Sequence, residues 1–143
     1  MHEIRLADTD EDIASTFCVM RQLRTQLIEQ DYVPLIRKMQ QGAGYKLAVL
    51  RDGATVRAVA GFRIADSLAW GHYVYIDDLV SDANARSTGC GAALLGWVAD
   101  YAKERGCTQL HLDSGVQRHE AHRFYLRERM DITAYHFRRE LPA

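Results

Sequence analysis

The stretch Tyr73 to Gly96, YVYIDDLVSDANARSTGCGAALLG, decides how this chain folds. From His72 to Val80 the residues are mostly β-branched, aromatic or apolar, which is typical of a strand. The polar run Ser81 to Ala85 then breaks this pattern. From Ala92 onward apolar residues recur at the spacing of one helix face. The stretch therefore predicts a strand, a turn, a glycine-bearing loop and a helix, in that order.

The loop Arg86 to Gly91, RSTGCG, stands where the helix is expected to begin. Gly89 and Gly91 remove side chains there, and the N–H groups of a first helical turn carry a partial positive charge. The N-terminus of a helix commonly binds a phosphate group. Thr88 and Ser87 are candidates to cap the helix. A tight turn without a ligand would use the same glycines, so these residues alone leave both interpretations open.

Composition places the chain among ordinary globular proteins. Its 143 residues suit a single domain over 1–143, and 48% are apolar and 26% charged, enough to build a core. The net charge of −1 does not indicate a nucleic-acid partner. No apolar run approaches the roughly 20 residues that a membrane helix needs. The start, MHEIRLADTDED, is unlike a signal peptide, and a cytoplasmic protein is expected.

The cysteines and histidines do not predict a metal site. Three cysteines are present without a CxxC pair or zinc-ligand spacing, which favours reduced thiols in a cytosolic protein. His119 and His122 lie three residues apart, whereas the HExxH helix places them four apart. Cys90 lies at a helix start, which lowers a thiol pKa, but no histidine is adjacent in sequence and no nucleophilic role is assigned.

The remaining chain alternates helix and strand signals. The expected elements are a strand over Glu3–Ala7, a helix with apolar positions from Ile13 to Leu27, a short helix over Leu35–Gln41 after the interrupting Pro34, strands over Tyr45–Arg51 and Thr55–Ala65, a helix over Cys90–Arg105, a strand over Gln109–Asp113, a helix over Arg118–Arg129 and a final strand over Ile132–Leu141. Asp52-Gly53 predicts a hairpin, and Gly61 a bulge or a close approach. The helical pair is either solvated or one wall of a cleft. The class is α/β, with antiparallel strands followed by a parallel pair, flanked by helices.

Two segments together carry a resemblance to a known family. Arg86 to Gly91 follows the apolar strand end Leu79-Val80-Ser81, and Ala121-His-Arg-Phe-Tyr125 lies on the later helix. With both in this order, the chain resembles the GNAT superfamily of N-acetyltransferases over essentially its whole length. It departs from the family pattern at Ala83, where a proline is usual, and at Arg129-Met130, where glycine and phenylalanine are frequent.

The resemblance implies a single-domain fold whose parallel strand pair splits around acetyl-CoA. The family's backbone contacts to the pantetheine arm would fall on Leu79, Val80 and Ser81, and those to the pyrophosphate on Arg86, Ser87, Thr88, Gly89, Cys90, Gly91 and Ala92. A backbone N–H near Leu79 would polarise the thioester carbonyl.

The resemblance also implies the catalytic residues. Tyr125 matches the family tyrosine that protonates the departing thiolate, and a phenol with a reference pKa near 10 is protonated at neutral pH. Asp77 is the preferred base for the attacking amine, with Asp78 as the alternative. Because neighbouring strand residues point to opposite faces, at most one of these aspartates should face the cleft. A core aromatic at Tyr125, and aspartates that only cap the strand or pair with arginine, are the other interpretations.

The sequence therefore predicts an acetyl-CoA-dependent N-acetyltransferase that acts by direct transfer to a primary amine of a small molecule, peptide or protein. Two alternatives remain: a CoA-binding regulatory module without turnover, and an acyltransferase that uses a longer acyl-CoA. Glu29, Asp31 and Asp77 weakly favour a cationic acceptor. No nucleic acid or membrane partner and no metal are expected, and a homodimer through the last strand is left open.

Overall fold

The computed structural model describes residues 2–86 and 88–143, and the chain divides into two compact units, Met1–Leu112 and Asp113–Ala143. The first unit holds a five-stranded sheet in the order β1-β2-β3-β4-β5. The strands are β1 His2–Leu6, β2 Lys46–Asp52, β3 Thr55–Ser67, β4 Gly71–Ser81 and β5 Gln109–Leu112. Neighbouring strands are antiparallel except for β4 and β5, which run parallel as expected. A single domain over 1–143 stays a prediction.

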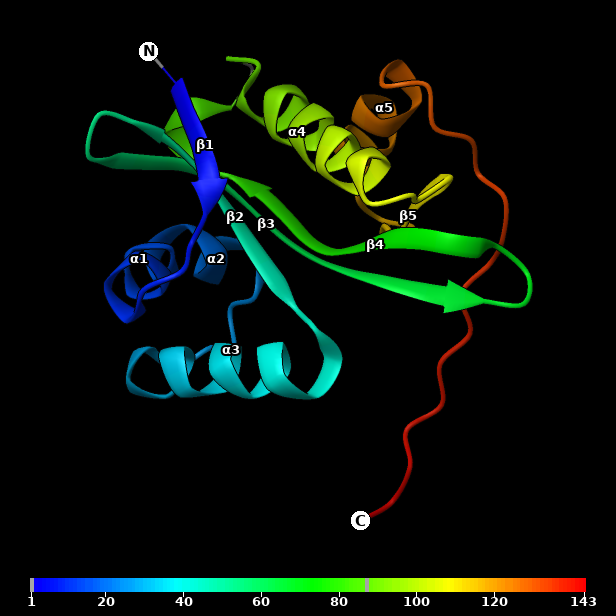
Figure 1. Ribbon diagram of the computed structural model, residues 1–143, viewed down its shortest axis with the longest axis horizontal. Coiled ribbons are helices and arrows are strands. Elements are labelled where there is room, and N and C mark those ends of the chain that lie inside the picture. Colours follow the sequence, from blue (N-terminus) through cyan, green and yellow to red (C-terminus); the bar gives the residue numbers. More distant parts are fainter. Residues whose placement is uncertain (1, 87) are drawn as a thin grey trace. The chain divides into compact units, whose positions relative to one another are not determined.

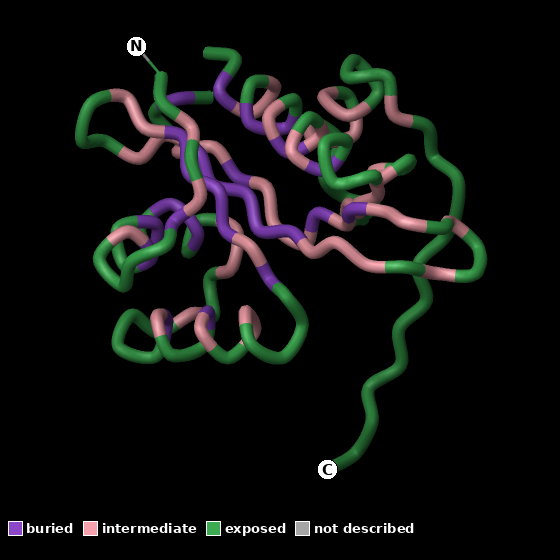
Figure 2. Tube along the Cα trace, viewed as in Figure 1, coloured by how far each residue is buried: buried purple, intermediate pink, exposed green. Residues whose placement is uncertain are grey.

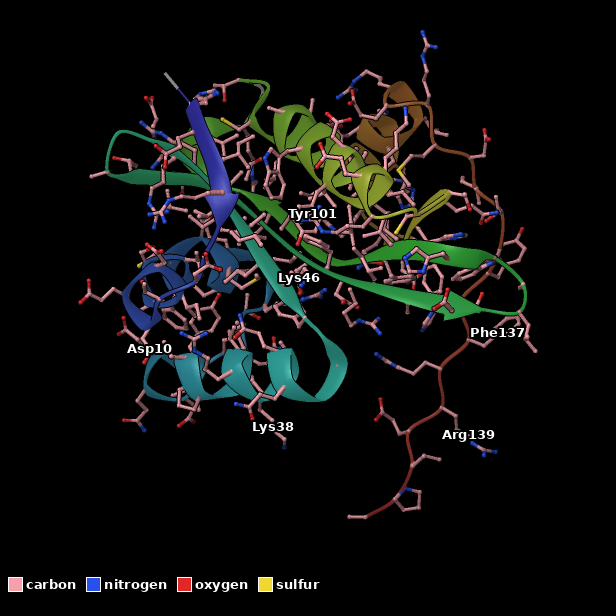
Figure 3. The ribbon with its side chains drawn as sticks, in the orientation of Figure 1. Asp10, Lys38, Lys46, Tyr101, Phe137 and Arg139 are labelled. Atoms are coloured by element: carbon pink, nitrogen blue, oxygen red, sulfur yellow. The ribbon has the colours of Figure 1, made fainter. Side chains whose placement is uncertain are left out.

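Helices cover both faces of this sheet (Figure 1). The helices of the first unit are α1 Asp10–Ser15, α2 Phe17–Leu23, α3 Glu29–Ala43 and α4 Cys90–Glu104, with a short 3-10 helix η1 at Ala83–Ala85. On one face, α1–α3 bury Ile13, Tyr32 and Ile36 in a core cluster with strand residues such as Val49 and Val59. On the other face, the α4 residue Tyr101 meets Phe62 edge to face, with ring centroids 5.6 Å apart (Figure 3). The expected mixed α/β architecture is confirmed.

The pairing of β3 with β4 confirms the role expected for Gly61. The strand pairing shifts register between Gly61 and Phe62, so a bulge lies here. A Cβ atom at position 61 would come within 1.6 Å of the Tyr45 hydroxyl oxygen, far closer than real atoms approach. Glycine is thus required because the Tyr45 side chain lies directly over its backbone.

The N-terminal helices differ from the expected pair. The helix is interrupted at Thr16, between α1 and α2. The buried Thr16 hydroxyl donates to the Ile13 carbonyl at 2.7 Å and lies 2.7 Å from the Tyr32 hydroxyl. A threonine hydroxyl that bonds the local backbone competes with helix continuation. The expectation that Pro34 interrupts was also wrong, because α3 begins at Glu29 and contains it. The buried side chains of Tyr32 and Ile36 hold this helix against the core despite the lost hydrogen bond.

The second unit contains α5, His119–Arg127, as expected, but not the final strand. Residues 132–141 form no strand, and Phe137 is 91% exposed (Figures 2 and 3). The one ion pair described between this segment and the rest of its unit joins His136 Nδ1 to Asp113 at 2.7 Å. The alternating pattern over Ile132–Leu141 was therefore misleading, since a strand also requires a neighbouring strand to pair with.

We expect the free energy of unfolding to fall as the pH rises above 10. Burial raises the pKa of Tyr32 from 10.0 to about 12, so the folded chain keeps a proton that the unfolded chain loses above pH 10. Tyr32 makes its full contribution to the free energy of unfolding below pH 10, and roughly 3 kcal/mol of this contribution is lost once the pH passes 12. Urea titrations at pH 8 and pH 11 measure the difference. Tyr32→Phe should reduce that pH dependence, and an unchanged dependence would contradict the assignment.

None of the helices described in residues 2–86 and 88–143 is both long and apolar enough to cross a bilayer.

Candidate active site

The pairing of the parallel strands β4 and β5 stops partway along β4. Their pairing runs from Tyr73 opposite Gln109 to Ile76 opposite Leu112, where β5 ends. β4 continues to Ser81, paired on its other side with β3. Within the described part of the chain, β4 beyond Ile76 therefore has a strand neighbour on one side only. A backbone edge of this kind can accept an extended ligand as an added strand.

The register shows which backbone groups face this open side. The Asp82 N–H donates to the Arg57 carbonyl at 2.7 Å, which marks a hydrogen-bonded pair between β4 and β3. Because bonded and unbonded pairs alternate along antiparallel strands, Val80 also directs its backbone N–H to β3. Leu79 and Ser81 then direct their N–H and C=O groups to the side where β5 has ended. These two residues were predicted to bind the pantetheine arm.

The glycine loop leads directly into α4. Gly89 is the N-terminal cap residue, with φ of +86°, and no side chain among the described residues caps the helix. The first intrahelical hydrogen bond runs from the Ala93 N–H to the Gly89 carbonyl at 3.0 Å. The N–H groups of Cys90, Gly91 and Ala92 precede this bond and have no acceptor inside the helix. The geometry expected of an anion site is thus present at these three residues.

The hydroxyl groups of the loop do not act as expected. Thr88 donates its hydroxyl to the Ala85 carbonyl instead of capping α4, so that expectation was wrong. Ser87, which was also predicted to cap the helix and to bind the cofactor, lies outside the described residues. The exposed Arg86 follows the 3-10 helix η1 directly and brings a positive charge to the loop.

Cys90 is buried at the start of α4. Its sulfur lies 3.3 Å from the Thr88 hydroxyl and 3.9 Å from the Nε2 atom of His2. This histidine neighbour could not be predicted from local sequence, because His2 belongs to β1, far from Cys90 along the chain. The whole residue is only 2% exposed, so the sulfur is not available to react with a ligand at the surface.

A bulge at Asp77 changes how the two aspartates are presented. Gly61 is opposite Asp78 and Phe62 is opposite Ile76, so Asp77 is the extra residue of β4. The strict alternation from which one aspartate was expected to face each side is therefore interrupted. Arg24, at the end of α2, donates to the Asp78 carboxylate and to the backbone carbonyl oxygen of Asp77. The expectation that at most one of them faces the cleft stays a prediction.

Both carboxylates are held by specific partners. The Arg63 Nε and Nη2 atoms donate to Asp77 at 2.7 and 2.8 Å, in a bidentate pair. The Arg24 Nε atom and the Tyr45 hydroxyl each donate to Asp78 at 2.8 Å. Burial, together with the Asp78 charge, raises the pKa of Tyr45 well above 10.0, so this phenol remains a donor. The sequence analysis missed Arg63 and Tyr45, although Gly61, two residues before Arg63, marked the place.

Tyr125 belongs to the second unit, on α5. Burial raises its pKa above 10.0, while the Arg118 guanidinium acts in the opposite direction. The phenol is therefore protonated at neutral pH, as a general acid must be. The first unit brings together Asp77, the strand end from Leu79 to Ser81 and the start of α4. The catalytic role of Tyr125 toward these groups stays a prediction.

Comparison with known proteins agrees with this geometry. Residues 11–130 match the family model described as the acetyltransferase (GNAT) family. An uncharacterized N-acetyltransferase, YhdJ, of Bacillus subtilis (strain 168) is 33% identical over 141 residues, covering 97% of this chain and 99% of that protein. The aminoalkylphosphonate N-acetyltransferase of Salmonella typhimurium is 28% identical over 145 residues, covering 97% and 91%.

Solved structures show the same fold. An aminoglycoside N-acetyltransferase in complex with CoA superposes with a TM-score of 0.85 at 12% identity, over 100% of this chain and 96% of that one. At such low identity the likeness shows the fold alone. In the aminoglycoside N-acetyltransferase, a protein with this fold binds CoA.

Proposed function

Because the chain belongs to the acetyltransferase (GNAT) family, we propose that it moves the acetyl group of acetyl-CoA directly to a primary amine. The observation that carries this proposal is the juxtaposition of two backbone features. β4 continues past the end of β5 with Leu79 and Ser81 facing the open side, and the α4 start presents unbonded N–H groups. An extended arm ending in a diphosphate matches this combination.

The proposed cofactor contacts follow from this arrangement. Leu79, Val80 and Ser81 take the pantetheine arm, with Leu79 and Ser81 supplying the hydrogen bonds. The pyrophosphate occupies the loop and helix start formed by Arg86, Thr88, Gly89, Cys90, Gly91 and Ala92, together with Ser87, which is outside the described residues. The helix dipole and the Arg86 charge both favour an anion there.

The proposed reaction needs three groups. The amine nitrogen attacks the thioester carbonyl carbon, whose oxygen accepts a hydrogen bond from the Leu79 N–H as negative charge develops. The carbon–sulfur bond then breaks, and the thiolate takes a proton from Tyr125. Asp77 accepts the proton that the amine loses, directly or through one water molecule. Each oxygen of Asp77 already accepts one bond from Arg63, and each keeps further lone pairs for this task.

A small-molecule or peptide amine is the proposed acceptor. The named relatives include acetyltransferases of aminoalkylphosphonates and of aminoglycosides, which are small molecules with amino groups. A cytoplasmic location completes the proposal, whereas a homodimer through the last strand has no basis because residues 132–141 form no strand. The three cysteines are free, which supports a reducing compartment.

The proposal is tested by incubating the purified full chain with acetyl-CoA and a panel of amines, and measuring release of free thiol. We expect release that depends on both the enzyme and an amine. Tight binding of CoA without release for any amine would favour the regulatory module. Release from longer acyl-CoA thioesters but not from acetyl-CoA would favour the other alternative.

The orientation of the β4 backbone predicts a local spectroscopic change. On titration with CoA, the amide signals of Leu79 and Ser81 should shift strongly in NMR spectra, because their N–H groups would form new hydrogen bonds. The amide of Val80 is the internal control, since its N–H faces β3 and should shift less. A larger shift at Val80 than at its two neighbours would contradict the pantetheine assignment.

A further inference from the structure

Two arginines flank Asp77 at the bulge where β4 leaves β5. Arg63, from β3, holds the Asp77 carboxylate through its Nε and Nη2 atoms at 2.7 and 2.8 Å. Arg24, at the end of α2, donates its Nη2 group to the Asp77 carbonyl oxygen at 2.7 Å. Both guanidinium groups therefore lie within one hydrogen bond of the same residue, which is the proposed proton acceptor.

Neither arginine uses all of its donors. A guanidinium carries five N–H bonds, and the contacts of Arg24 and Arg63 use only Nε and Nη2. Within the part of the chain that is described, no residue accepts a hydrogen bond from either Nη1 group. The side chains are 42% exposed for Arg24 and 37% exposed for Arg63. The Arg63 guanidinium also lies 5.6 Å from the Tyr75 ring centroid, which steadies its orientation.

The charges at this place balance. Two guanidinium groups face two carboxylates, those of Asp77 and Asp78, so the cluster is neutral as a whole. The Asp77 side chain is 28% exposed and that of Asp78 only 14%, so Asp77 is the carboxylate that a ligand can reach. A polyamine would bring its second cation beside two arginines. A ligand with one cation and one anion meets an opposite charge at each end.

We propose, on the basis of the function proposed above, that the acceptor is a zwitterion, a primary amine joined by a short linker to a carboxylate or phosphonate. The amine lies against Asp77, and the acid accepts hydrogen bonds from the Nη1 groups of Arg24 and Arg63. Guanidinium groups bind both acids strongly because their planar donors match two oxygens at once. The arginines that neutralise the aspartates thus also select the acceptor, and a simple cationic amine is not preferred.

Acceptor competition tests this assignment directly. The full chain with acetyl-CoA is assayed against β-alanine and aminoethylphosphonate, with propylamine as the matched cation that lacks the acid group and putrescine as the dication. We expect kcat/KM to be at least about tenfold higher for the two acid-bearing amines, which is the range of a charged hydrogen bond. Equal or better use of propylamine or putrescine would overturn the assignment.

Substitution of the arginines tests which groups make the selection. Arg24→Gln and Arg63→Gln should each lower the ratio of kcat/KM for β-alanine over propylamine by roughly tenfold. The ratio is the informative quantity, because a loosened structure would slow both amines together and leave it unchanged. Arg105→Gln is the matched control, since Arg105 lies over the Tyr101 ring of α4, on the other face of the sheet. A ratio that stays constant in both test variants would refute the proposal.

Calorimetry separates this inference from the proposed transfer. Aminoethylphosphonate and putrescine are titrated into the wild-type chain and into Arg63→Gln, with no acetyl-CoA present. We expect the zwitterion to bind the wild type more tightly and to lose this advantage in the variant. This outcome supports the site even if no amine releases thiol, a result that would defeat only the transfer reaction. Tighter binding of putrescine by the wild type would defeat the acceptor assignment alone.

Discussion

Tyr125→Phe should lower kcat about 100-fold or more while leaving the affinity for acetyl-CoA nearly unchanged, which is the usual scale for loss of a general acid. The substitution removes one hydroxyl group from α5 and keeps the ring. Burial raises the pKa of Tyr125 above 10.0, so the wild-type phenol holds its proton across the neutral range and can give it to the thiolate. Single-turnover kinetics with saturating acetyl-CoA measures the chemical step directly.

Tyr135→Phe is the matched control for this experiment. Tyr135 lies in the same unit, is exposed and follows α5 in a segment without regular structure, so loss of its hydroxyl should not change kcat. In the wild type, activity should fall above pH 10 as Tyr125 loses its proton. This fall should be missing from the pH profile of Tyr125→Phe. Full turnover in Tyr125→Phe would remove the tyrosine from the mechanism and leave the thiolate to be protonated by solvent.

Gly89→Val should weaken CoA binding by roughly 10- to 100-fold, because a left-handed backbone costs a residue with a Cβ atom about 1–2 kcal/mol and a β-branched residue more. Gly89 caps α4 at φ of +86°, and nothing lies within 4 Å of the Cβ position. The cost therefore comes from the backbone and from the diphosphate proposed to lie there, not from crowding by the chain. Isothermal titration with CoA measures the loss.

Gly96→Ala is the control for Gly89→Val, since Gly96 lies inside α4 with open space at its Cβ position. Alanine favours a helix interior over glycine by up to about 1 kcal/mol, so this variant should melt at a higher temperature and bind CoA normally. Wild-type affinity in Gly89→Val, with the helix intact by circular dichroism, would show that the diphosphate binds elsewhere.

The central strand and the helix after it could be predicted because their signals are local. Periodic apolar residues and a left-handed glycine determine where β4 ends and α4 begins. The predicted boundaries of helices and strands were wrong where a residue distant in sequence determines the local structure. Thr16 breaks a helix through the distant Tyr32, and Pro34 stays inside one because its neighbours are buried. The segment Ile132–Leu141 alternates like a strand, but a strand forms only with a pairing partner. The sequence of one segment does not show whether such a partner exists.

The candidate site was predictable to the same degree. The backbone groups from Leu79 to Ser81 and at the start of α4 follow from a motif that is contiguous in sequence. The bulge at Asp77 could not be located, because it depends on the register with β3. Arg24 and Arg63 reach Asp77 from distant positions along the chain, so the balanced charge of the site emerges only when strand and helix are placed together.

The Tyr45 hydroxyl occupies the space that any side chain at position 61 would fill, and it also holds Asp78. A side chain at position 61 therefore requires a smaller residue at position 45, so the two positions are coupled during divergence. Laboratory evolution toward new acceptors should randomise the two codons as a single unit. A library that varies codon 61 while Tyr45 is retained should return many unfolded clones, because every side chain added there meets the Tyr45 ring.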